Sequence, residues 1–408
     1  MPLGARVLHS RVAGPRDPGE GRTGPDPAGA PSARPAGVKL QITGVSTVAL
    51  RAPLEADFKG SHYHMTNRAT LVTRVHTAEG VVGEAYAGDE DSTLLQIQTI
   101  VHEEVAPAVV GLDAICVERC WKAGFPATFD ILRDRRLALV ALAGVDAAIW
   151  DAVGKALGVP LWRLWGGYRN RVPLIAIGGY YGEPLGTIEE EISSYVEMGL
   201  AGVKFKVGGC SPAEDAERVT RARAAAPQGF VIALDANQGY TVAEAVELGR
   251  RVEDLGIEWF EEPVNWEDDR RGMRDVRMRG PLPICAGQSE TSPAGCRELM
   301  ELGAIDYCNF DASWSGGPTA WRRMAAVAST YGVRVGHHEE PQVASHLVAS
   351  QAHGTFVECF HPRRDPFWWN LIANRPPLEG GELVLSDDPG LGWVLDEDYV
   401  ERCTVGRR

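Results

Sequence analysis

Short apolar runs recur along the second half of the chain, and each of them ends close to a polar side chain. The polar residues that follow seven of these runs are Lys204 with Lys206, Asp235, Glu261, Gln288, Asp311, His338 and Glu358. The intervening stretches have the apolar spacing that is typical of amphipathic helices. Strands that alternate with helices in this way predict a parallel sheet.

The alternating pattern contains eight strand candidates, at residues 172–178, 202–207, 230–235, 257–261, 283–287, 305–310, 333–337 and 355–360. In a (β/α) barrel, side chains at the carboxyl ends of the strands all reach one mouth, where such folds carry their active sites. Polar side chains scattered through a core would not keep to strand ends. We therefore predict an α/β fold in which residues 169–370 form a (β/α)7β TIM-like barrel with a catalytic site.

The segments on either side of the barrel differ from it in composition. Residues 1–37 are rich in Pro, Gly, Ala and Arg and lack the continuous apolar stretch of a signal peptide, so we expect a disordered extension. Residues 38–168 combine strand patterns with helical patterns, which predicts an α+β capping domain. The irregular segment 371–408 is expected to return to this capping domain and complete it.

The net charge limits the kinds of partner to be expected, and the cysteines indicate the cellular location. The chain has 41 basic and 55 acidic residues, a formal net charge of −14, which argues against nucleic acid or an anionic membrane as a partner. No run approaches the roughly 18 apolar residues of a membrane span. Within the helical stretch 137–158, Asp146 and Asp151 are expected to cap the helix or to pair locally. The eight cysteines include no CxxC pair, and Cys285 and Cys308 lie in apolar runs, so we expect reduced thiols and a cytoplasmic location.

Lys204 and Lys206 lie two residues apart on one predicted strand, so both side chains point to the same face. Neighbouring ammonium groups repel each other, and we expect this repulsion to lower the pKa of both. A lysine with a lowered pKa beside a divalent cation is suited to act as a general base. A solvated basic strand end is the alternative, and the polar residues at the neighbouring strand ends argue against it.

Asp235, Glu261 and Gln288 follow three adjacent predicted strands. Three oxygen-bearing side chains without clustered Cys or His suit Mg²⁺. Two alternatives stay open: Asp235 also fits a helix N-cap or a turn, and Glu261 with Glu262 also fits an exposed pair before Pro263.

His338 and Asp311 end the seventh and sixth predicted strands, which are neighbours in a barrel. A carboxylate that accepts the imidazole proton fixes the histidine tautomer and raises its basicity. A His–Asp pair facing a lysine across the mouth provides two bases on opposite faces of a bound carbon. His337 should point the other way, and Glu358 is suited to hydrogen-bond a substrate oxygen unless it is an exposed strand end.

Together these residues resemble the enolase superfamily and, within it, the mandelate racemase subgroup, over residues 38–400. The matching motifs are Lys204-Phe205-Lys206, Asp235-Ala236-Asn237, Phe260-Glu261-Glu262-Pro263, Asp311 with the Gly316-Gly317 turn, His338, Glu358 and PGLGW at 389–393. One position departs from the family pattern, because Gln288 stands where the third metal ligand is a glutamate. An amide oxygen can bind Mg²⁺ but removes one negative charge, and Glu290 is a possible compensating carboxylate.

The resemblance implies abstraction of the proton α to a carboxylate, with Mg²⁺ and Glu358 stabilising the enediolate. Lys206 and His338 on opposite faces permit racemisation or epimerisation, and loss of a β-hydroxyl gives dehydration instead. Subgroup members with this dyad often dehydrate sugar acids, so we predict a lyase that converts a sugar acid to a 2-keto-3-deoxy acid. A racemase or epimerase of a 2-hydroxy acid is the alternative. A non-catalytic barrel, with Gln288 marking a decayed metal site, is the alternative from another class.

Substrate choice is expected to lie in loops over the barrel mouth. The segment 51–68 contains His62 and Arg68 and resembles a polar lid, although an ordinary hydrophilic loop is an equal alternative. Asn237 and Trp314 follow the first metal ligand and the dyad aspartate and are expected to line the pocket. We expect a small carboxylate substrate and a homo-oligomer.

Overall fold

The computed structural model describes residues 39–87, 92–182 and 184–408. The expected disordered extension, residues 1–37, lies outside the described residues and stays a prediction.

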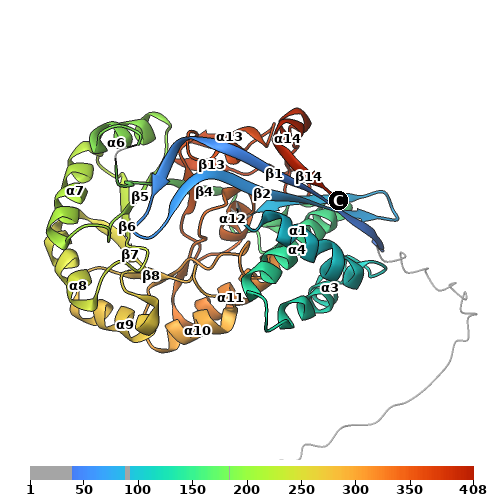
Figure 1. The fold of residues 1–408 in the computed structure, drawn as a ribbon, viewed down its shortest axis with the longest axis horizontal. Helices are drawn as coiled ribbons and strands as arrows, with labels where there is room; N and C mark the ends of the chain where they lie inside the picture. The colour runs from blue at the N-terminus through green and yellow to red at the C-terminus, as the bar shows by residue number, and fades with distance from the viewer. Residues whose placement is uncertain (1–38, 88–91, 183) are drawn as a thin grey trace, which may run out of the picture. The chain divides into compact units, whose positions relative to one another are not determined.

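The first domain is built on an antiparallel sheet of four strands, in the order β14-β1-β2-β3 (Figure 1). These strands are β1 (Ile42–Lys59), β2 (His64–Thr77), β3 (Val82–Ala87) and β14 (Thr404–Arg407). The hairpin of β1 and β2 continues to the pair Lys59–His64, further than the predicted strands, with an irregularity between Pro53 and Phe58. The tip of this hairpin reaches the barrel, because the Ser61 hydroxyl donates to the carbonyl of Ala236 (3.2 Å).

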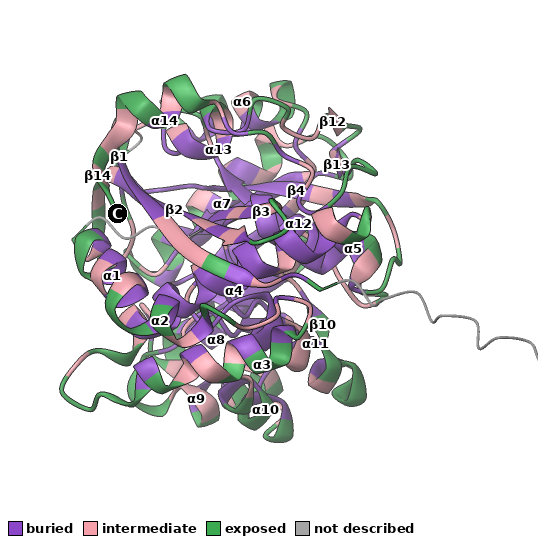
Figure 2. Cartoon of the chain, turned by 90° about the vertical axis from the view of Figure 1, so that its right-hand side faces the viewer, coloured by how far each residue is buried: buried purple, intermediate pink, exposed green. Residues whose placement is uncertain are grey.

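Helices cover this sheet. They are α1 (Leu94–Ile100), a π-helical turn (Val101–Val105), α2 (Ala106–Val109), α3 (Val117–Gly124), a 3-10 turn (Phe125–Phe129), α4 (Arg135–Leu157) and α5 (Leu161–Leu164). By length and composition α4 alone, among the described helices, could cross a membrane, so the expectation that no run is long and apolar enough is wrong. It packs on β2 and β3, and 83% of its most apolar window is buried, which is the position of a core helix (Figure 2).

The second domain contains eight parallel strands at the predicted positions. They are β4 (Arg171–Gly178), β5 (Gly202–Lys206), β6 (Val231–Asp235), β7 (Ile257–Glu261), β8 (Ile284–Ala286), β9 (Tyr307–Cys308), β10 (Arg334–Val335) and β11 (Val357–Phe360). Neighbours in sequence pair from β4 to β10, and β11 pairs with β4. A single parallel bridge between Val335 and Gly354 connects β10 to the segment before β11. The pairing follows the order of a barrel.

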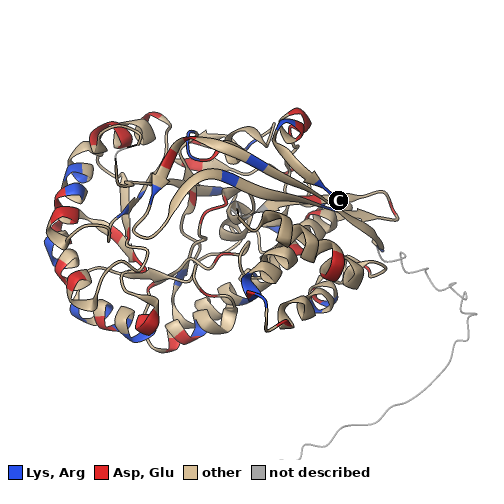
Figure 3. Cartoon of the chain, viewed as in Figure 1, with Lys and Arg blue, Asp and Glu red and all other residues tan. Residues whose placement is uncertain are grey.

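Helices on the outer side connect these strands (Figure 1). They are α6 (Ile188–Glu197), α7 (Pro212–Ala225), α8 (Val242–Arg251), α9 (Asp269–Arg279), α10 (Pro293–Glu301), α11 (Pro318–Tyr331) and α12 (Pro341–Ala349). Three of them begin with a capping box, in which Thr187, Ser211 or Thr241 exchanges hydrogen bonds with a glutamate three residues on. Both signs of charge are interspersed over the outer helices (Figure 3).

The C-terminal segment contacts both domains. After α13 (Pro366–Asn370) come β12 (Leu378–Glu379) and β13 (Glu382–Val384), and β13 pairs antiparallel with β4. The chain then passes α5, where Leu161 N donates to the carbonyl of Gly390 (2.8 Å). It ends with α14 (Glu397–Cys403) and β14, which pairs with β1 of the first domain.

Asp146 and Asp151 of α4 accept hydrogen bonds from segments that are distant in the sequence, so the expectation that they cap or pair locally is incomplete. Asp146 is buried and accepts hydrogen bonds from the backbone N–H and the hydroxyl of Thr319, both at 2.8 Å. Asp151 pairs locally with Lys155 (2.6 Å) but also accepts from the backbone of Leu391 (2.7 Å). The hydrophobic spacing of one helix contains no information about these partners.

Candidate active site

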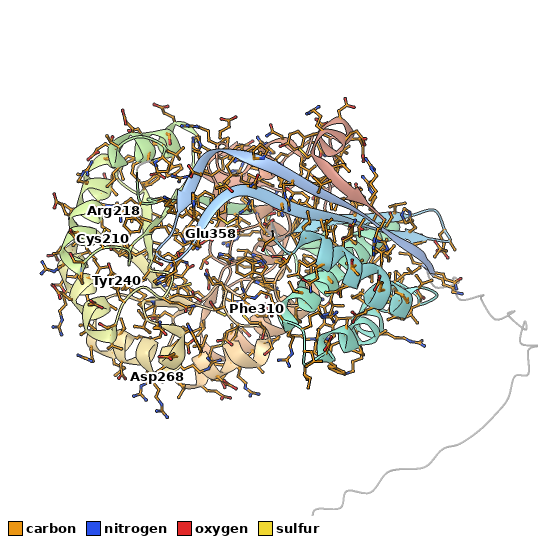
Figure 4. The ribbon with its side chains drawn as sticks, viewed as in Figure 1. Cys210, Arg218, Tyr240, Asp268, Phe310 and Glu358 are labelled. Carbon is orange, nitrogen blue, oxygen red and sulfur yellow. The ribbon has the colours of Figure 1, made fainter. Side chains whose placement is uncertain are left out.

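Eight of the predicted site residues converge at the carboxyl ends of the barrel strands, and none of these eight is more than 6% exposed. The set is Lys204, Lys206, Asp235, Glu261, Gln288, Asp311, His338 and Glu358. In Figure 4, Glu358 lies inside the ring of helices, whereas Asp268, before α9, lies towards its outer edge. Burial of so many ionisable groups in one place is costly unless they are paired, and their pairing defines the site.

Lys204 and Lys206 do share a face of β5, but their pKa values move in the direction opposite to our expectation. Lys204 Nζ lies 2.7 Å from Glu261 Oε1, 2.9 Å from Glu358 and 3.6 Å from Asp235 Oδ2. Lys206 Nζ lies 2.6 Å from Asp235 Oδ2. Burial alone would lower the pKa of both lysines, but these carboxylates outweigh burial and mutual repulsion and raise it.

Asp235 and Glu261 end adjacent strands, and Glu261 also accepts a hydrogen bond from the indole of Trp259 (3.1 Å). Burial raises the pKa of Asp235, but the ammonium groups of Lys206 and Lys204 more than reverse this, so Asp235 is ionised. Both carboxylates are fully buried and already face cationic groups. The helix after Asp235 is capped by Thr241, and Glu261 is fully buried, so the interpretations of Asp235 as a helix cap and of Glu261 as part of an exposed pair are wrong. Asp235 does take part in a turn, because its Oδ1 accepts the backbone N–H of Asn237 (2.9 Å).

Gln288 lies beside two further polar side chains. Its amide nitrogen donates to Glu262 Oε2 (3.4 Å), and its amide oxygen accepts from Asn309 Nδ2 (3.5 Å). Within the described residues no group of three or more His, Cys, Asp and Glu side chains is arranged to hold a metal ion. A Mg²⁺ site here would therefore comprise two carboxylates and one neutral amide, and this all-oxygen donor set is one that Mg²⁺ accepts.

Glu290 does not join these oxygen ligands. Both of its carboxylate oxygens lie 3.0 Å from Arg270 Nη2, on the outer helix α9, and its carboxylate packs against Gly295 at the start of α10. The ion pair with Arg270 holds the side chain in the helical layer. We therefore correct the suggestion that Glu290 replaces the missing carboxylate.

His338 and Asp311 form the expected dyad. His338 Nδ1 lies 2.9 Å from Asp311 Oδ2, while Asp311 Oδ1 accepts from the backbone and hydroxyl of Ser313 (2.7 and 2.6 Å). Burial lowers the pKa of His338, but the negative charges of Glu339 and Asp311 raise it overall to about 9. His337 points elsewhere, as expected: its Nε2 accepts from the backbone N–H of Ala312 (2.9 Å).

Glu358 is buried rather than exposed at its strand end. Its carboxylate accepts from Lys204 Nζ (2.9 Å) and from the backbone N–H of Glu339 (3.0 Å). These two bonds hold Glu358 below the floor of the site, where it links the lysine strand to the loop that carries the dyad histidine.

A cavity of about 620 Å³ lies above these residues. The hairpin of β1 and β2 contributes one wall, with Phe58, His62, Tyr63, Met65 and Arg68. The barrel contributes the other walls and the floor, with Lys206, Asn237, Gln238, Glu262, Asn265, Trp266, Gln288, Ser289, Trp314, His338 and Glu339. The part of the predicted lid segment from Phe58 to Arg68 thus lines the same cavity as Lys206 and His338, and so do Asn237 and Trp314. Lys206 Nζ donates to Asn237 Oδ1 (2.9 Å).

Sequence reasoning missed several residues that line this cavity, among them Arg136 and Glu339, and it gave Glu262 no place in the site. Glu262 and Glu339 have φ angles of 36° and 49°, a backbone conformation that is uncommon for residues other than glycine and is typical of functional loops. Their position next to Glu261 and His338 was a usable signal. Arg136 comes from the first turn of α4, about 70 residues before the barrel site begins, and had no such signal.

Two family models match the chain, one for each of the two domains described above. Residues 42–166 match the family model "Mandelate racemase / muconate lactonizing enzyme, N-terminal domain", and residues 187–399 match the model "Enolase C-terminal domain-like". A crystal structure of a mandelate racemase/muconate lactonizing enzyme from a marine actinobacterium in complex with magnesium is 63% identical. The match has a TM-score of 0.86 and covers 90% of this chain and 100% of that chain.

More distant relatives have named activities. The arabinonate dehydratase of Saccharolobus solfataricus is 30% identical over 340 residues, which are 81% of this chain and 89% of the relative. The L-talarate/galactarate dehydratase of Salmonella typhimurium, liganded with Mg and L-lyxarohydroxamate, is 25% identical, with a TM-score of 0.83 and coverage of 94% and 98%. Other relatives are cycloisomerases and racemases or epimerases. Since both domain models match, the chain belongs to the mandelate racemase/muconate lactonizing enzyme subgroup of the enolase superfamily.

Proposed function

We propose that this protein is a Mg²⁺-dependent enzyme that removes the proton α to a carboxylate and dehydrates a sugar acid to a 2-keto-3-deoxy acid. The observation that carries the proposal is that Lys206, from β5, and His338, from the loop after β10, line the same cavity, with His338 bonded to Asp311 behind it. A substrate carbon between Lys206 and His338 has a proton-transfer group on each face.

Asp235, Glu261 and the amide of Gln288 are the residues that would hold the cation. The α-proton of a carboxylate is weakly acidic, and bound Mg²⁺ supplies positive charge that stabilises the negative charge developing on the substrate carboxylate. Related proteins with magnesium in their structures support this assignment.

Lys206 and His338 then each carry out one of the two proton transfers. Asp235 raises the pKa of Lys206, but a cation held by Asp235 would offset that negative charge and favour the free amine. In that form Lys206 takes the proton from the α-carbon and leaves an enediolate. The bond between the β-carbon and its hydroxyl breaks next, and His338 donates a proton so that the hydroxyl departs as water. The enol product tautomerises to the 2-keto acid. Because the pKa of His338 is raised to about 9, this imidazole holds its proton at neutral pH, which suits the acid role.

A direct test is to incubate the full-length protein with Mg²⁺ and a library of aldonic and aldaric acids and to assay for 2-keto acids. We expect product from at least one acid, and loss of product with EDTA and in the Lys206→Ala variant. Absence of product from every acid, with Mg²⁺ bound, would contradict the dehydratase assignment.

Racemisation or epimerisation of a 2-hydroxy acid is the second candidate. It is favoured by the presence of two proton-transfer groups, Lys206 and His338, in one cavity and by relatives such as an N-succinyl-L-Arg/Lys racemase. Loss of optical rotation without formation of a keto acid would identify it. A non-catalytic protein is the third candidate, and calorimetry that detects no Mg²⁺ binding at millimolar concentrations would favour it.

A further inference from the structure

The side chain of Arg136 lines the catalytic cavity without an acidic partner. Its guanidinium carbon lies 5.0 Å from the ring centroid of Trp314, and that ring lies 4.8 Å from the ring of His338. Arg136 is therefore separated from the dyad histidine by one indole ring. Within the part of the chain that the structure describes, no carboxylate is recorded within ion-pair distance of this guanidinium.

The other lysine and arginine side chains that line the cavity have carboxylate partners. Arg68 lies 3.4 Å from Glu340, 3.5 Å from Glu339 and 3.9 Å from Asp365. Lys206 is bound by Asp235 (2.6 Å). Among the described lysines and arginines of the cavity wall, Arg136 is thus the one whose charge is left for a bound molecule.

Arg136 has the chemistry of an anion-binding group. A guanidinium presents parallel N–H groups that match a carboxylate in a bidentate manner, and a ring stacked beneath it limits its rotation. Neutral hydrogen-bonding side chains that suit hydroxyl groups also line the cavity: Gln238, Asn265 and Ser289. The wall thus has one region that suits hydroxyls and one that suits a negative charge, besides the region of Lys206.

We propose that Arg136 binds a second carboxylate at the far end of the substrate, so that the preferred substrates are sugar diacids (aldaric acids) rather than monoacids. The proposal rests on the proposed function, which places the reacting carboxylate near Asp235, Glu261 and Lys206. In that pose the α-carbon lies between Lys206 and His338, and the chain of hydroxyl-bearing carbons extends past Trp314 towards Arg136.

The test compares Arg136→Gln and Arg136→Lys with Arg135→Gln. Arg135 is a matched control, because its Nε donates to the carbonyl of Thr128 (3.3 Å) and it lines a different cavity. For each protein, kcat/KM is measured for an aldaric acid and for the aldonic acid of the same configuration. Calorimetry in the presence of Mg²⁺ measures the binding of an unreactive dicarboxylate (glutarate) and monocarboxylate (butyrate).

Arg136→Gln should lower the diacid values about tenfold or more and leave the monoacid values within about twofold, since a hydrogen bond to a charged group is lost. Arg136→Lys should lose less, and Arg135→Gln should match the parent. Equal loss for both acids, or no loss, would overturn the assignment. A preference for a phosphorylated monoacid over the diacid, dependent on Arg136, would also overturn it. Because the glutarate measurement needs no turnover, an Arg136-dependent glutarate affinity in a protein that dehydrates nothing would reject the proposed function alone.

Discussion

The imidazole of His338 is bonded through Nδ1 to Asp311 Oδ2 at 2.9 Å, and Asp311 is itself held by Ser313. Because Nδ1 is occupied, Nε2 is the remaining ring nitrogen, and it lies 3.5 Å from Oε1 of Glu339, another residue that lines the cavity. The dyad thus fixes the position of the histidine and favours its protonated form.

Asp311→Asn should lower turnover of the best substrate by about 10²–10⁴-fold, because the carboxylate that positions and charges His338 is lost. Ser313→Ala, which removes one of the bonds to Asp311, should cost much less. Steady-state kinetics with Mg²⁺ at saturating concentration measures both. Equal effects of the two variants would show that Asp311 has a structural role rather than one in the chemistry.

Glu339→Gln should move the pH dependence of kcat/KM to lower pH. The largest influence that raises the pKa of His338 is the charge of Glu339, so the neutral amide lowers this pKa from about 9 towards its usual value. If protonated His338 acts as the acid, activity is present below its pKa and is lost above it, so the decline occurs at lower pH in the variant. A pH profile identical to that of the parent would show that the titration of His338 does not determine the pH dependence of kcat/KM.

Gln288→Glu should tighten Mg²⁺ binding, because the substitution returns one negative charge to a site with two carboxylates. Calorimetric titration of the parent and the variant measures the difference, which we expect to be about tenfold. Glu290→Gln is the control and should leave the affinity unchanged, since Arg270 holds this carboxylate. Weaker binding in Gln288→Glu would mean that the site is built around the amide.

Asp146→Ala should destabilise the protein by about 2–3 kcal/mol, because it leaves the buried N–H and hydroxyl of Thr319 without an acceptor. Asp130→Ala is the control: this exposed carboxylate accepts one bond, from the backbone of Leu132, and its loss should change stability by less than about 0.5 kcal/mol. Chemical denaturation measures both. Similar values for the two would contradict the role of Asp146 in joining the domains.

The strands and the polar residues at their ends were predictable, because local apolar spacing determines β4 to β11 and the carboxyl end of a parallel strand determines where Asp235 or His338 points. Contacts between distant segments were not. The pKa of Lys206 depends on Asp235, which only the barrel brings within 2.6 Å, and the partner of Asp146 lies on α11. Arg136 was missed for the same reason, since its place in the cavity depends on how α4 packs against the barrel.

The central claim is that Lys206 removes the α-proton from one face of the substrate and that His338, on the opposite face, protonates the departing hydroxyl. The most direct measurement is incorporation of solvent deuterium at the α-carbon, followed by NMR, for the parent and for Lys206→Ala and His338→Asn with Mg²⁺ present. We predict that Lys206→Ala abolishes exchange from the face that the parent deprotonates. His338→Asn should retain exchange on that face while losing elimination of water. Exchange as fast as that of the parent in both variants would contradict the claim.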